Sequence, residues 1–303
     1  MADGLVIWVL GDGKPGHENQ ALGLTEALGR MVRCTVKRLA VGELGRLERL
    51  AWLRRFPDAG APPDLIVGAG HATHWGLLML ARKYRARSVV LMKPSLPLRW
   101  FDLCVAPEHD FGDGRVGQNV ITTMGAINRV RCDKSRRGQG GLLLVGGPSA
   151  THDWDSDAVV DQLRRIVDGA SPGKWRLTTS RRTPPEMEDK LREALPRVKV
   201  FAHEDTGPEW LPTQLARVAE VWVTEDSVSM VYEALSSGAR VGLLPVPRKT
   251  GDSRVLRGLA GLVEQGFVTP YDDWTRTGTL AAPPHVLQEA DRCAERVLER
   301  LFS

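Results

Sequence analysis

Leu5-Val-Ile-Trp-Val-Leu10 is followed directly by Gly11-Asp-Gly-Lys-Pro-Gly16-His17. A run of six apolar residues that ends at glycines predicts a buried strand, because a strand covered on both faces has no polar side. The glycines predict a tight turn, and the residues after them predict a helix at about 18–31. This order of strand, turn and helix is typical of an α/β protein whose parallel sheet lies between layers of helices.

The same order recurs along the rest of the chain. Leu65-Ile-Val67 leads through Gly68-Ala-Gly70 into an expected helix that carries Trp75, Leu78 and Met79. Further strands are expected at residues 88–92, 103–105, 142–145, 175–178, 198–201, 221–223 and 241–244. A helix is expected at about 155–167, and apolar residues near helical spacing predict a closing amphipathic helix at about 284–302.

The chain length favours two domains, because 303 residues exceed what one hydrophobic core usually holds. The polar, glycine-rich and basic segment 131–141 is expected to be a linker. We therefore predict a Rossmann-like domain at 1–130 and a second one at 142–303, which includes the closing helix. In such an arrangement we expect a ligand in a cleft between the domains, where the carboxyl ends of both sheets meet.

Composition limits the classes of function. A content of 42% apolar and 26% charged residues excludes a disordered chain, a collagen-like chain and a small disulfide-stabilised protein. The net charge of +4 is too small to favour a nucleic-acid partner, but it suits phosphate ligands or an anionic membrane surface. The four cysteines form no CxxC pair, which fits a reducing cytosol. The apolar run at 5–10 is too short to cross a bilayer and lacks the charge of a signal peptide, so we expect a cytoplasmic protein.

The first candidate loop, residues 11–17, matches G-x-G-x-x-G between a strand and a helix. A dinucleotide site is one interpretation, but an acidic residue is missing about 20 positions later, and Pro15 removes an N–H from the loop. A second interpretation is a tight turn without further function. The third, which we favour, is a loop whose Asp12, Lys14 and His17 face the cleft.

The second candidate loop begins at Glu225-Asp226-Ser227 and leads into an expected helix. Asp226 or Ser227 can cap this helix, whose N-terminus offers free N–H groups and a positive dipole to a phosphate. Glu233 lies near the middle of the helix and could accept hydrogen bonds from a ribose diol. The alternative makes Glu233 an ordinary solvated helix residue.

Other loops carry weaker signals. Two loops that follow strands are Gly146-Gly-Pro-Ser149 and Thr178-Thr-Ser-Arg181-Arg182. Their hydroxyl and guanidinium groups suit diphosphate oxygens, but solvated turns without a ligand explain them equally well. His71 and His74 share a helix face without a third metal ligand, so His71 is expected to be a cleft residue. Asp153-Trp-Asp155-Ser-Asp157 resembles a metal motif, but we interpret it as an N-cap and an acidic first turn.

Residues 95–101 combine apolar and aromatic side chains with an arginine. They could insert into a bilayer interface, or they could simply lead into the strand expected at 103–105. We favour the second interpretation.

Four motifs together resemble the bacterial members of the elongated-mitochondria family, named after a plant mitochondrial-fission factor. They are Gly11-Asp-Gly-Lys-Pro-Gly-His-Glu-Asn-Gln20, Gly68-Ala-Gly-His71, Lys93-Pro-Ser95 and Thr224-Glu-Asp-Ser-Val-Ser-Met230. The similarity extends along nearly the whole chain. It implies the fold of GT-B glycosyltransferases, in which two Rossmann-like domains face a cleft.

The resemblance also implies roles for single residues. The opening loop is similar to the G-x-x-G-G-H turn of the peptidoglycan glucosaminyltransferase, with Pro15 in place of a glycine. Glu225 and Glu233 have the E-x7-E spacing of many retaining GT-B enzymes, whose second glutamate binds the nucleotide ribose. The intervening Asp226 and Ser227 depart from the residues usual there, which leaves retention or inversion open.

The resulting hypothesis is a metal-independent GT-B glycosyltransferase without a cofactor. It would transfer a sugar from a nucleotide-sugar donor to an envelope glycan or glycolipid, with a possible peripheral contact to the inner membrane and no nucleic-acid partner. Asp12 and His17 are the candidate catalytic residues, as the general base of an inverting transfer. The expected substrate-binding residues are Gly13, Lys14, Gly16, His71, Gly146, Gly147, Ser149, Thr179, Ser180, Arg181, Arg182, Glu225, Asp226, Ser227, Ser229 and Glu233.

Within this set, Glu233 is expected on the ribose, Ser227 and Ser229 on the diphosphate, and Arg181 and Arg182 on the leaving group. Two alternatives stay open. One is a non-catalytic protein that binds a nucleotide sugar or acts as a scaffold. The other is a non-hydrolysing epimerase of the GT-B type, which acts on a nucleotide sugar without an acceptor.

Overall fold

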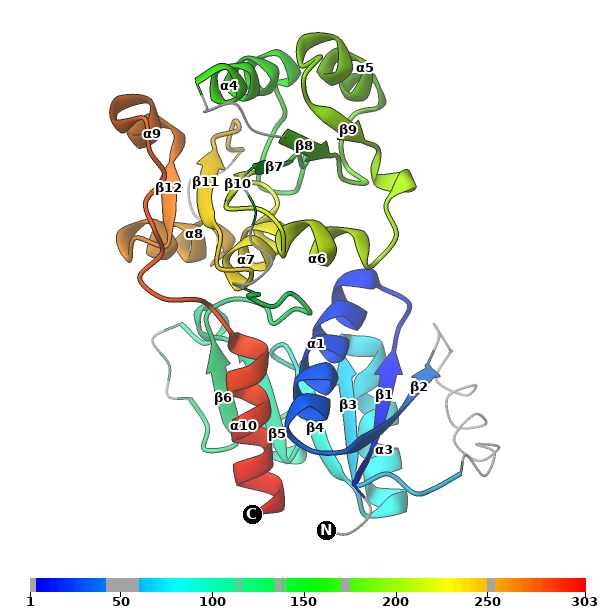
Figure 1. Ribbon diagram of the computed structural model, residues 1–303. Helices are drawn as coiled ribbons and strands as arrows, with labels where there is room; N and C mark the ends of the chain where they lie inside the picture. The colour runs from blue at the N-terminus through cyan, green and yellow to red at the C-terminus, as the bar shows by residue number, and fades with distance from the viewer. Residues whose placement is uncertain are drawn as a thin grey trace. The chain divides into compact units, whose positions relative to one another are not determined.

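The computed structural model describes residues 4–41, 60–112, 114, 116–133, 138, 140–169, 175–249 and 254–303. The chain divides into two compact units (Figure 1). Unit 1 comprises Met1–Arg129 together with Gln288–Ser303, and unit 2 comprises Val130–Leu287. Each unit contains one six-stranded parallel sheet, which confirms the α/β fold class expected from the sequence.

Unit 1 has the strand order β2-β1-β3-β4-β5-β6. Its strands are β1 (Leu5–Gly11), β2 (Cys34–Ala40), β3 (Leu65–Ala69), β4 (Arg87–Leu91), β5 (Leu103–Pro107) and β6 (Val120–Thr123). Its helices are α1 (Pro15–Met31), α3 (His74–Tyr84) and α10 (Glu289–Phe302), with short 3-10 turns η1 (His71–Thr73), η2 (Leu98–Trp100) and η3 (Glu108–Asp110).

Alternate residues of β1 face the two helical layers of unit 1. Ile7 and Val9 belong to the core that contains α1 and α10, whereas Trp8 and Leu10 belong to the core that contains α3. This period of two explains why the strand is apolar throughout: both of its faces are buried.

Unit 2 has the strand order β12-β11-β10-β7-β8-β9. Its strands are β7 (Gly141–Leu144), β8 (Trp175–Thr178), β9 (Lys199–Phe201), β10 (Glu220–Thr224), β11 (Arg240–Leu244) and β12 (Val268–Pro270). Its helices are α4 (Ser156–Gly169), α5 (Pro185–Ala194), α6 (Trp210–Leu215), α7 (Val228–Ser236), α8 (Arg254–Glu264) and α9 (Tyr271–Thr277), with the 3-10 turn η5 (His203–Asp205). Helices α4 and α5 lie on one side of the sheet, and α6, α7 and α8 lie on the other (Figure 1).

The expected domain boundary is wrong for the last helix. Helix α10 packs in unit 1, where Cys293, Ala294 and Val297 are buried in the same core as Leu24 and Leu28 of α1. Figure 1 shows α10 beside α1 and β6. The amphipathic pattern correctly predicts a helix with one apolar face, but it does not specify which sheet that face covers.

Polar contacts also hold α10 to unit 1. Arg30 of α1 forms an ion pair with Asp291. The carboxylate of Glu289 accepts a hydrogen bond of 2.9 Å from the N–H of Met124, and Arg300 donates to the carbonyl of Gln118 at 2.9 Å. Of the linker expected at 131–141, residues 134–137 and 139 lie outside the described residues, and Gly141 already belongs to β7.

The helices of the described ranges include none that is both long enough and apolar enough to span a membrane.

Candidate functional site

Each sheet contains one point at which the strand order reverses. In unit 1 the chain continues outward from β1 to β2 on one side and from β3 to β6 on the other, so the reversal lies between β1 and β3. In unit 2 it lies between β7 and β10. Loops that leave adjacent strands in opposite directions open a crevice at the carboxyl ends of the strands, which is where open α/β sheets bind ligands. The loops after β1, β3, β7 and β10 are therefore the first places to examine.

In unit 1, the loop after β1 holds an aspartate–histidine pair. The Asp12 Oδ2 atom lies 2.8 Å from His17 Nδ1, and the Asp12 side chain is only 3% exposed. Its other oxygen accepts a hydrogen bond of 3.1 Å from the N–H of Lys14, which shapes the loop as an Asx turn. When Nδ1 donates its proton to Asp12, Nε2 of His17 carries the lone pair and can accept a proton from a ligand.

The loop after β3 fits closely against this pair. Gly70 has φ +86° and ψ 156°, a conformation open almost only to glycine. A Cβ atom at Gly70 would overlap the His17 ring and would lie 2.8 Å from Asp12 Oδ2. By contrast, nothing lies within 4 Å of a Cβ placed at Gly13 or Gly16, so the outer side of the first loop is open.

His71 and His74 differ in exposure, although they are only three residues apart. His71 is exposed, and its Nδ1 lies 3.0 Å from the hydroxyl of Ser95. His74 is buried, and burial, followed by the nearby His71, lowers the pKa of His74 to about 4. Of the two histidines, His71 is therefore the one that solvent can reach; its expected place in a ligand cleft stays a prediction.

In unit 2, the loops after β7 and β10 are joined by the carboxylate of Asp226. This side chain has no exposed surface. Its Oδ2 atom accepts hydrogen bonds from the N–H of Gly147 at 3.1 Å, the hydroxyl of Ser227 at 3.0 Å and Nη2 of Arg182 at 2.7 Å. A buried carboxylate with charged and neutral donors is stable only while they remain in place, so Asp226 holds the crevice in one conformation.

Arg182 completes this junction from the loop after β8. Besides Asp226, it donates to the carbonyls of Gly147 at 2.6 Å and Pro148 at 3.0 Å, and to the hydroxyl of Ser227 at 2.9 Å. A Cβ atom at Gly147 would overlap the backbone carbonyl of Arg182, so the two loops touch through their main chains. Its neighbour Arg181 is exposed.

Thr179 and Ser180 have internal partners. The Thr179 hydroxyl donates to Glu188 at 3.0 Å and accepts from the N–H of His203 at 3.0 Å. The Ser180 hydroxyl accepts from the N–H of Arg182 at 3.2 Å. These two residues shape the loop after β8, and they lie beside the junction rather than in it.

Glu225, which the sequence predicts to contact a substrate, lies instead in a second buried cluster with Arg248 and His152, two residues that the sequence reasoning missed. Arg248 donates two hydrogen bonds to the Glu225 carboxylate, from Nη2 at 2.6 Å and from Nε at 3.2 Å, and His152 Nε2 lies 3.8 Å from Glu225 Oε1. The hydrogen bond to Glu225 raises the pKa of Arg248, and burial lowers the pKa of His152. Ser149 accepts a hydrogen bond of 3.0 Å from the N–H of His152, so the loops after β7, β10 and β11 converge here. The position of Arg248, just after a strand end, could have drawn attention to it.

Helix α7 begins directly above the junction. Ser227 is its N-cap residue, but its hydroxyl bonds Asp226 and Arg182 and does not cap the helix. The first intrahelical bond runs from the N–H of Val231 to the carbonyl of Ser227, so the N–H groups of residues 228–230 precede the hydrogen-bonded ladder. Ser229 is exposed and Glu233 is half-buried one turn later, which places both on the same side of the helix. This helix start can bind an anion.

Asp155 confirms the capping interpretation of the motif at 153–157. Its Oδ1 atom accepts a hydrogen bond of 3.0 Å from the N–H of Ala158 at the start of α4. Asp153 instead lies 3.4 Å from the Lys249 ammonium group, and Asp157 pairs with Lys190 at 2.9 Å. The three carboxylates therefore have separate partners.

Comparison with solved structures supports the fold. MurG from Acinetobacter baumannii superposes with a TM-score of 0.52 at 11% identity, covering 98% of this chain and 99% of that one. The UDP-GlcNAc 2-epimerase from Neisseria meningitidis, solved bound to UDP-GlcNAc, gives a TM-score of 0.56 at 11% identity and covers 98% of this chain and 100% of that one. At such identities the likeness shows the GT-B fold alone.

Among curated proteins, the uncharacterized protein RP120 from Rickettsia prowazekii is 29% identical over 117 residues, which are 35% of this chain. The match spans about a third of that relative, 33% of its length. The family model described as Mitochondrial fission ELM1 matches residues 15–301. This range begins at Pro15, so it contains His17 and the loops after β3, β7 and β10, whereas Asp12 in the loop after β1 lies just before it. The chain therefore belongs to the mitochondrial fission ELM1 family.

Proposed function

We propose that this protein is a metal-independent GT-B glycosyltransferase that uses a nucleotide-sugar donor and an envelope glycan or glycolipid as acceptor. One observation carries the proposal: in unit 2, buried Asp226 joins the loops after β7 and β10 directly below the start of α7. The result is a rigid edge beside the N–H groups of residues 228–230, which precede the hydrogen-bonded ladder of α7 and suit a diphosphate.

The donor binds to unit 2 in this proposal. The diphosphate accepts hydrogen bonds from the start of α7 and from the hydroxyl of Ser229, which is exposed. Arg181, also exposed, supplies a cation for the leaving group. Arg182 acts mainly on the protein itself, because it orients Gly147 and Ser227 through its hydrogen bonds. Gly146 and Gly147 are buried, and their lack of a side chain lets Asp226, Ser227 and the main chain of Arg182 pack against this loop and support the edge.

Glu233 binds the paired ribose hydroxyls. It lies one helical turn beyond Ser229 on the same side of α7, so a nucleotide whose phosphates lie at the helix start would place its ribose near this carboxylate. Hydrogen bonds to a charged acceptor are each worth about 1.5–3 kcal/mol, which makes Glu233 the most informative residue to change.

Unit 1 supplies the base for an inverting transfer. Nε2 of His17 takes the proton from the acceptor hydroxyl as its oxygen bonds the sugar carbon, and the bond from that carbon to the diphosphate breaks. The nucleoside diphosphate leaves with the electron pair. Asp12 orients the imidazole and stabilises its protonated form, since its buried oxygen lies 2.8 Å from Nδ1. General-base assistance of this kind contributes about 10²- to 10⁴-fold.

Calorimetry with uridine, cytidine and guanosine diphosphates and their sugars tests donor binding. Glu233→Ala should weaken binding of the preferred donor by at least about 100-fold, because one carboxylate loses hydrogen bonds to two hydroxyls, each worth about 1.5–3 kcal/mol. Glu193→Ala on exposed α5 is the matched control and should bind as the wild type. A Glu233→Ala variant with unchanged affinity would refute the ribose assignment.

Product analysis then separates the activities. His17→Ala should lower transfer about 10²- to 10⁴-fold and leave donor affinity unchanged. Conversion of the donor to an epimer without acceptor would identify an epimerase. Donor binding without transfer, hydrolysis or epimerisation would identify a binding or scaffold protein.

A further inference from the structure

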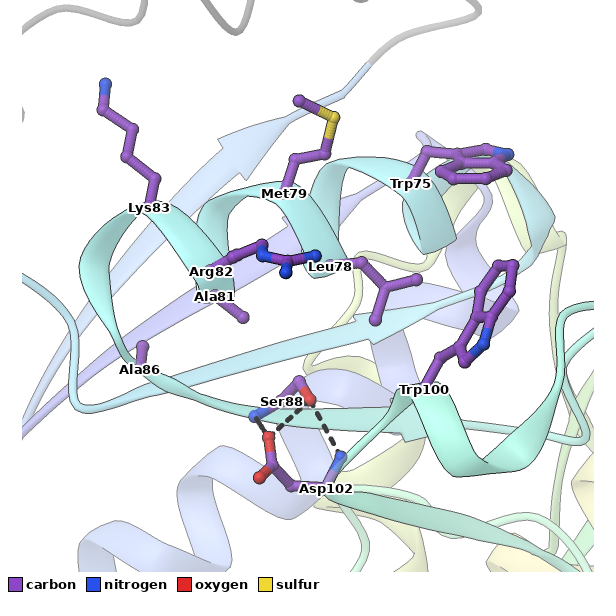
Figure 2. A pocket seen from close by; sticks show the side chains of 10 residues that line it. All are labelled: Trp75, Leu78, Met79, Ala81, Arg82, Lys83, Ala86, Ser88, Trp100 and Asp102. Atoms are coloured by element: carbon purple, nitrogen blue, oxygen red, sulfur yellow. Dashed lines mark hydrogen bonds between the residues drawn. The ribbon is translucent and has the colours of Figure 1, made fainter.

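A groove of about 910 Å³ lies on unit 1, and its lining residues include none from the loop after β1 or from residues 70–73 after β3 (Figure 2). Helix α3 forms one wall, and the other comes from Ser88 of β4 together with Trp100 and Asp102. Trp75, Met79 and Lys83 recur every four residues along one side of α3, and Leu78 and Arg82 lie beside them (Figure 2).

The rim of this groove is unusually apolar for a surface. In the part of the chain that the structure describes, six large apolar side chains are exposed by more than a third, and three of them line the groove. Trp75 is 48% exposed, Trp100 45% and Met79 42%. The two indole rings lie 6.0 Å apart, so they form one continuous apolar surface. Exposed apolar clusters of this kind mark contact surfaces.

Apart from Asp102, the charged residues that line the groove are the cations Arg82 and Lys83. From His71 to Phe101 the sequence contains no aspartate and no glutamate. The same stretch contains six exposed cations: Arg82, Lys83, Arg85, Arg87, Lys93 and Arg99. A surface of tryptophan, methionine and cations complements an anionic, partly apolar partner.

The first acidic residue after this stretch does not offset the positive charge at the rim. Asp102 accepts hydrogen bonds from the N–H and the hydroxyl of Ser88 at 2.8 and 2.7 Å (Figure 2). Its second oxygen accepts from Arg87 at 3.2 Å. The negative charge of Asp102 therefore offsets the positive charge of Arg87, and the charges of Arg82, Lys83 and Arg99 can attract an anion.

We infer that this face of unit 1 binds the surface of an anionic phospholipid bilayer. Tryptophan rings prefer the headgroup region, where their apolar body and polar N–H both find partners, and arginine and lysine pair with lipid phosphates. A second copy of the chain is a poorer partner, because a two-fold contact through this face would bring the same cations together. The inference uses no part of the nucleotide-sugar site, so either proposal can fail alone.

Flotation with vesicles tests the inference, and no nucleotide or acceptor is present. The whole protein should float with vesicles that contain phosphatidylglycerol and bind much less to pure phosphatidylcholine. Binding should weaken as salt is raised. Arg82→Gln with Lys83→Gln should lower the partition coefficient about 25-fold, since each cation near an anionic surface contributes about fivefold. Trp75→Ser with Trp100→Ser should lower it at least tenfold.

Matched variants keep the test specific. Lys190→Gln with Arg192→Gln on α5 removes the same charge from unit 2 and should leave binding within twofold. Val36→Ser removes an apolar side chain that is 43% exposed on β2 and should also leave it within twofold. Arg99→Gln, outside α3, should cost about fivefold, so the result does not depend on the folding of the helix.

Three results would overturn the inference. One is equal binding to anionic and neutral vesicles, and another is a groove variant that binds as tightly as the wild type. The third is sedimentation that shows a dimer which the Trp75→Ser and Trp100→Ser changes dissociate, because the face would then be a subunit interface.

Discussion

Replacing Gly70 by alanine should separate the two loops that meet in unit 1. The backbone at this residue, φ +86° and ψ 156°, costs an alanine about 1–3 kcal/mol. The new methyl group would also overlap the His17 ring, which must then leave Asp12 and lose their hydrogen bond of 2.8 Å. We assign about 1 kcal/mol to that bond, because His17 is partly exposed. The expected loss is about 2–4 kcal/mol of unfolding free energy.

Urea unfolding followed by tryptophan fluorescence measures this loss. Gly16→Ala, in the first turn of α1, is the control, since an added Cβ at Gly16 has nothing within 4 Å and should change stability by less than about 1 kcal/mol. In a His17→Ala background, Gly70→Ala should cost less, because the ring overlap is gone and only the backbone penalty remains. The reasoning is refuted if Gly70→Ala unfolds within about 1 kcal/mol of Gly16→Ala.

Two further changes test buried charges. The pKa of buried His74 is lowered to about 4, so between pH 6.5 and 4 the unfolded chain binds a proton that the folded chain does not. The free energy of unfolding should therefore fall by up to about 3 kcal/mol as the pH falls through this window. In urea unfolding measured at several pH values, His74→Gln should remove this part of the pH dependence. Arg182→Met should lower the free energy of unfolding in urea by about 2–3 kcal/mol, because the Asp226 carboxylate is fully buried and would lose its charged donor. Arg181→Met should have little effect. Equal stability of the two variants would contradict the role given to Asp226.

The central strands were predictable because each is an apolar run between turn residues. Strands 175–178 and 241–244 were predicted to within one residue at each end. The edge strands β6 and β12, of four and three residues, were missed, although the equally short edge strand β9 was expected at 198–201. Helix α1 begins at Pro15, three residues earlier than expected, although proline is common at the first helical position.

The candidate site was predictable where its signals are local. Asp12 lies in the loop after β1 and His17 lies in the first turn of α1, only five residues later, so the strand–turn–helix pattern places them near each other. Glu225 and Arg248 lie after different strands, so only the strand order brings them together. Arg182 was expected to contact a ligand, but its charge is directed at Asp226, because a sequence does not show which anion a cation will meet first.

The position of α10 has a consequence for synthesis of the chain on the ribosome. Cys293, Ala294 and Val297 are translated after the whole of unit 2, yet they cover apolar residues of α1, which is translated before it. Until about 160 residues of unit 2 have been made, α1 has an uncovered apolar face. The nascent N-terminal half is therefore exposed to aggregation and to chaperone binding. A chain truncated before Gln288 should keep the apolar face of α1 uncovered, because unit 2 supplies no replacement for α10 in that core.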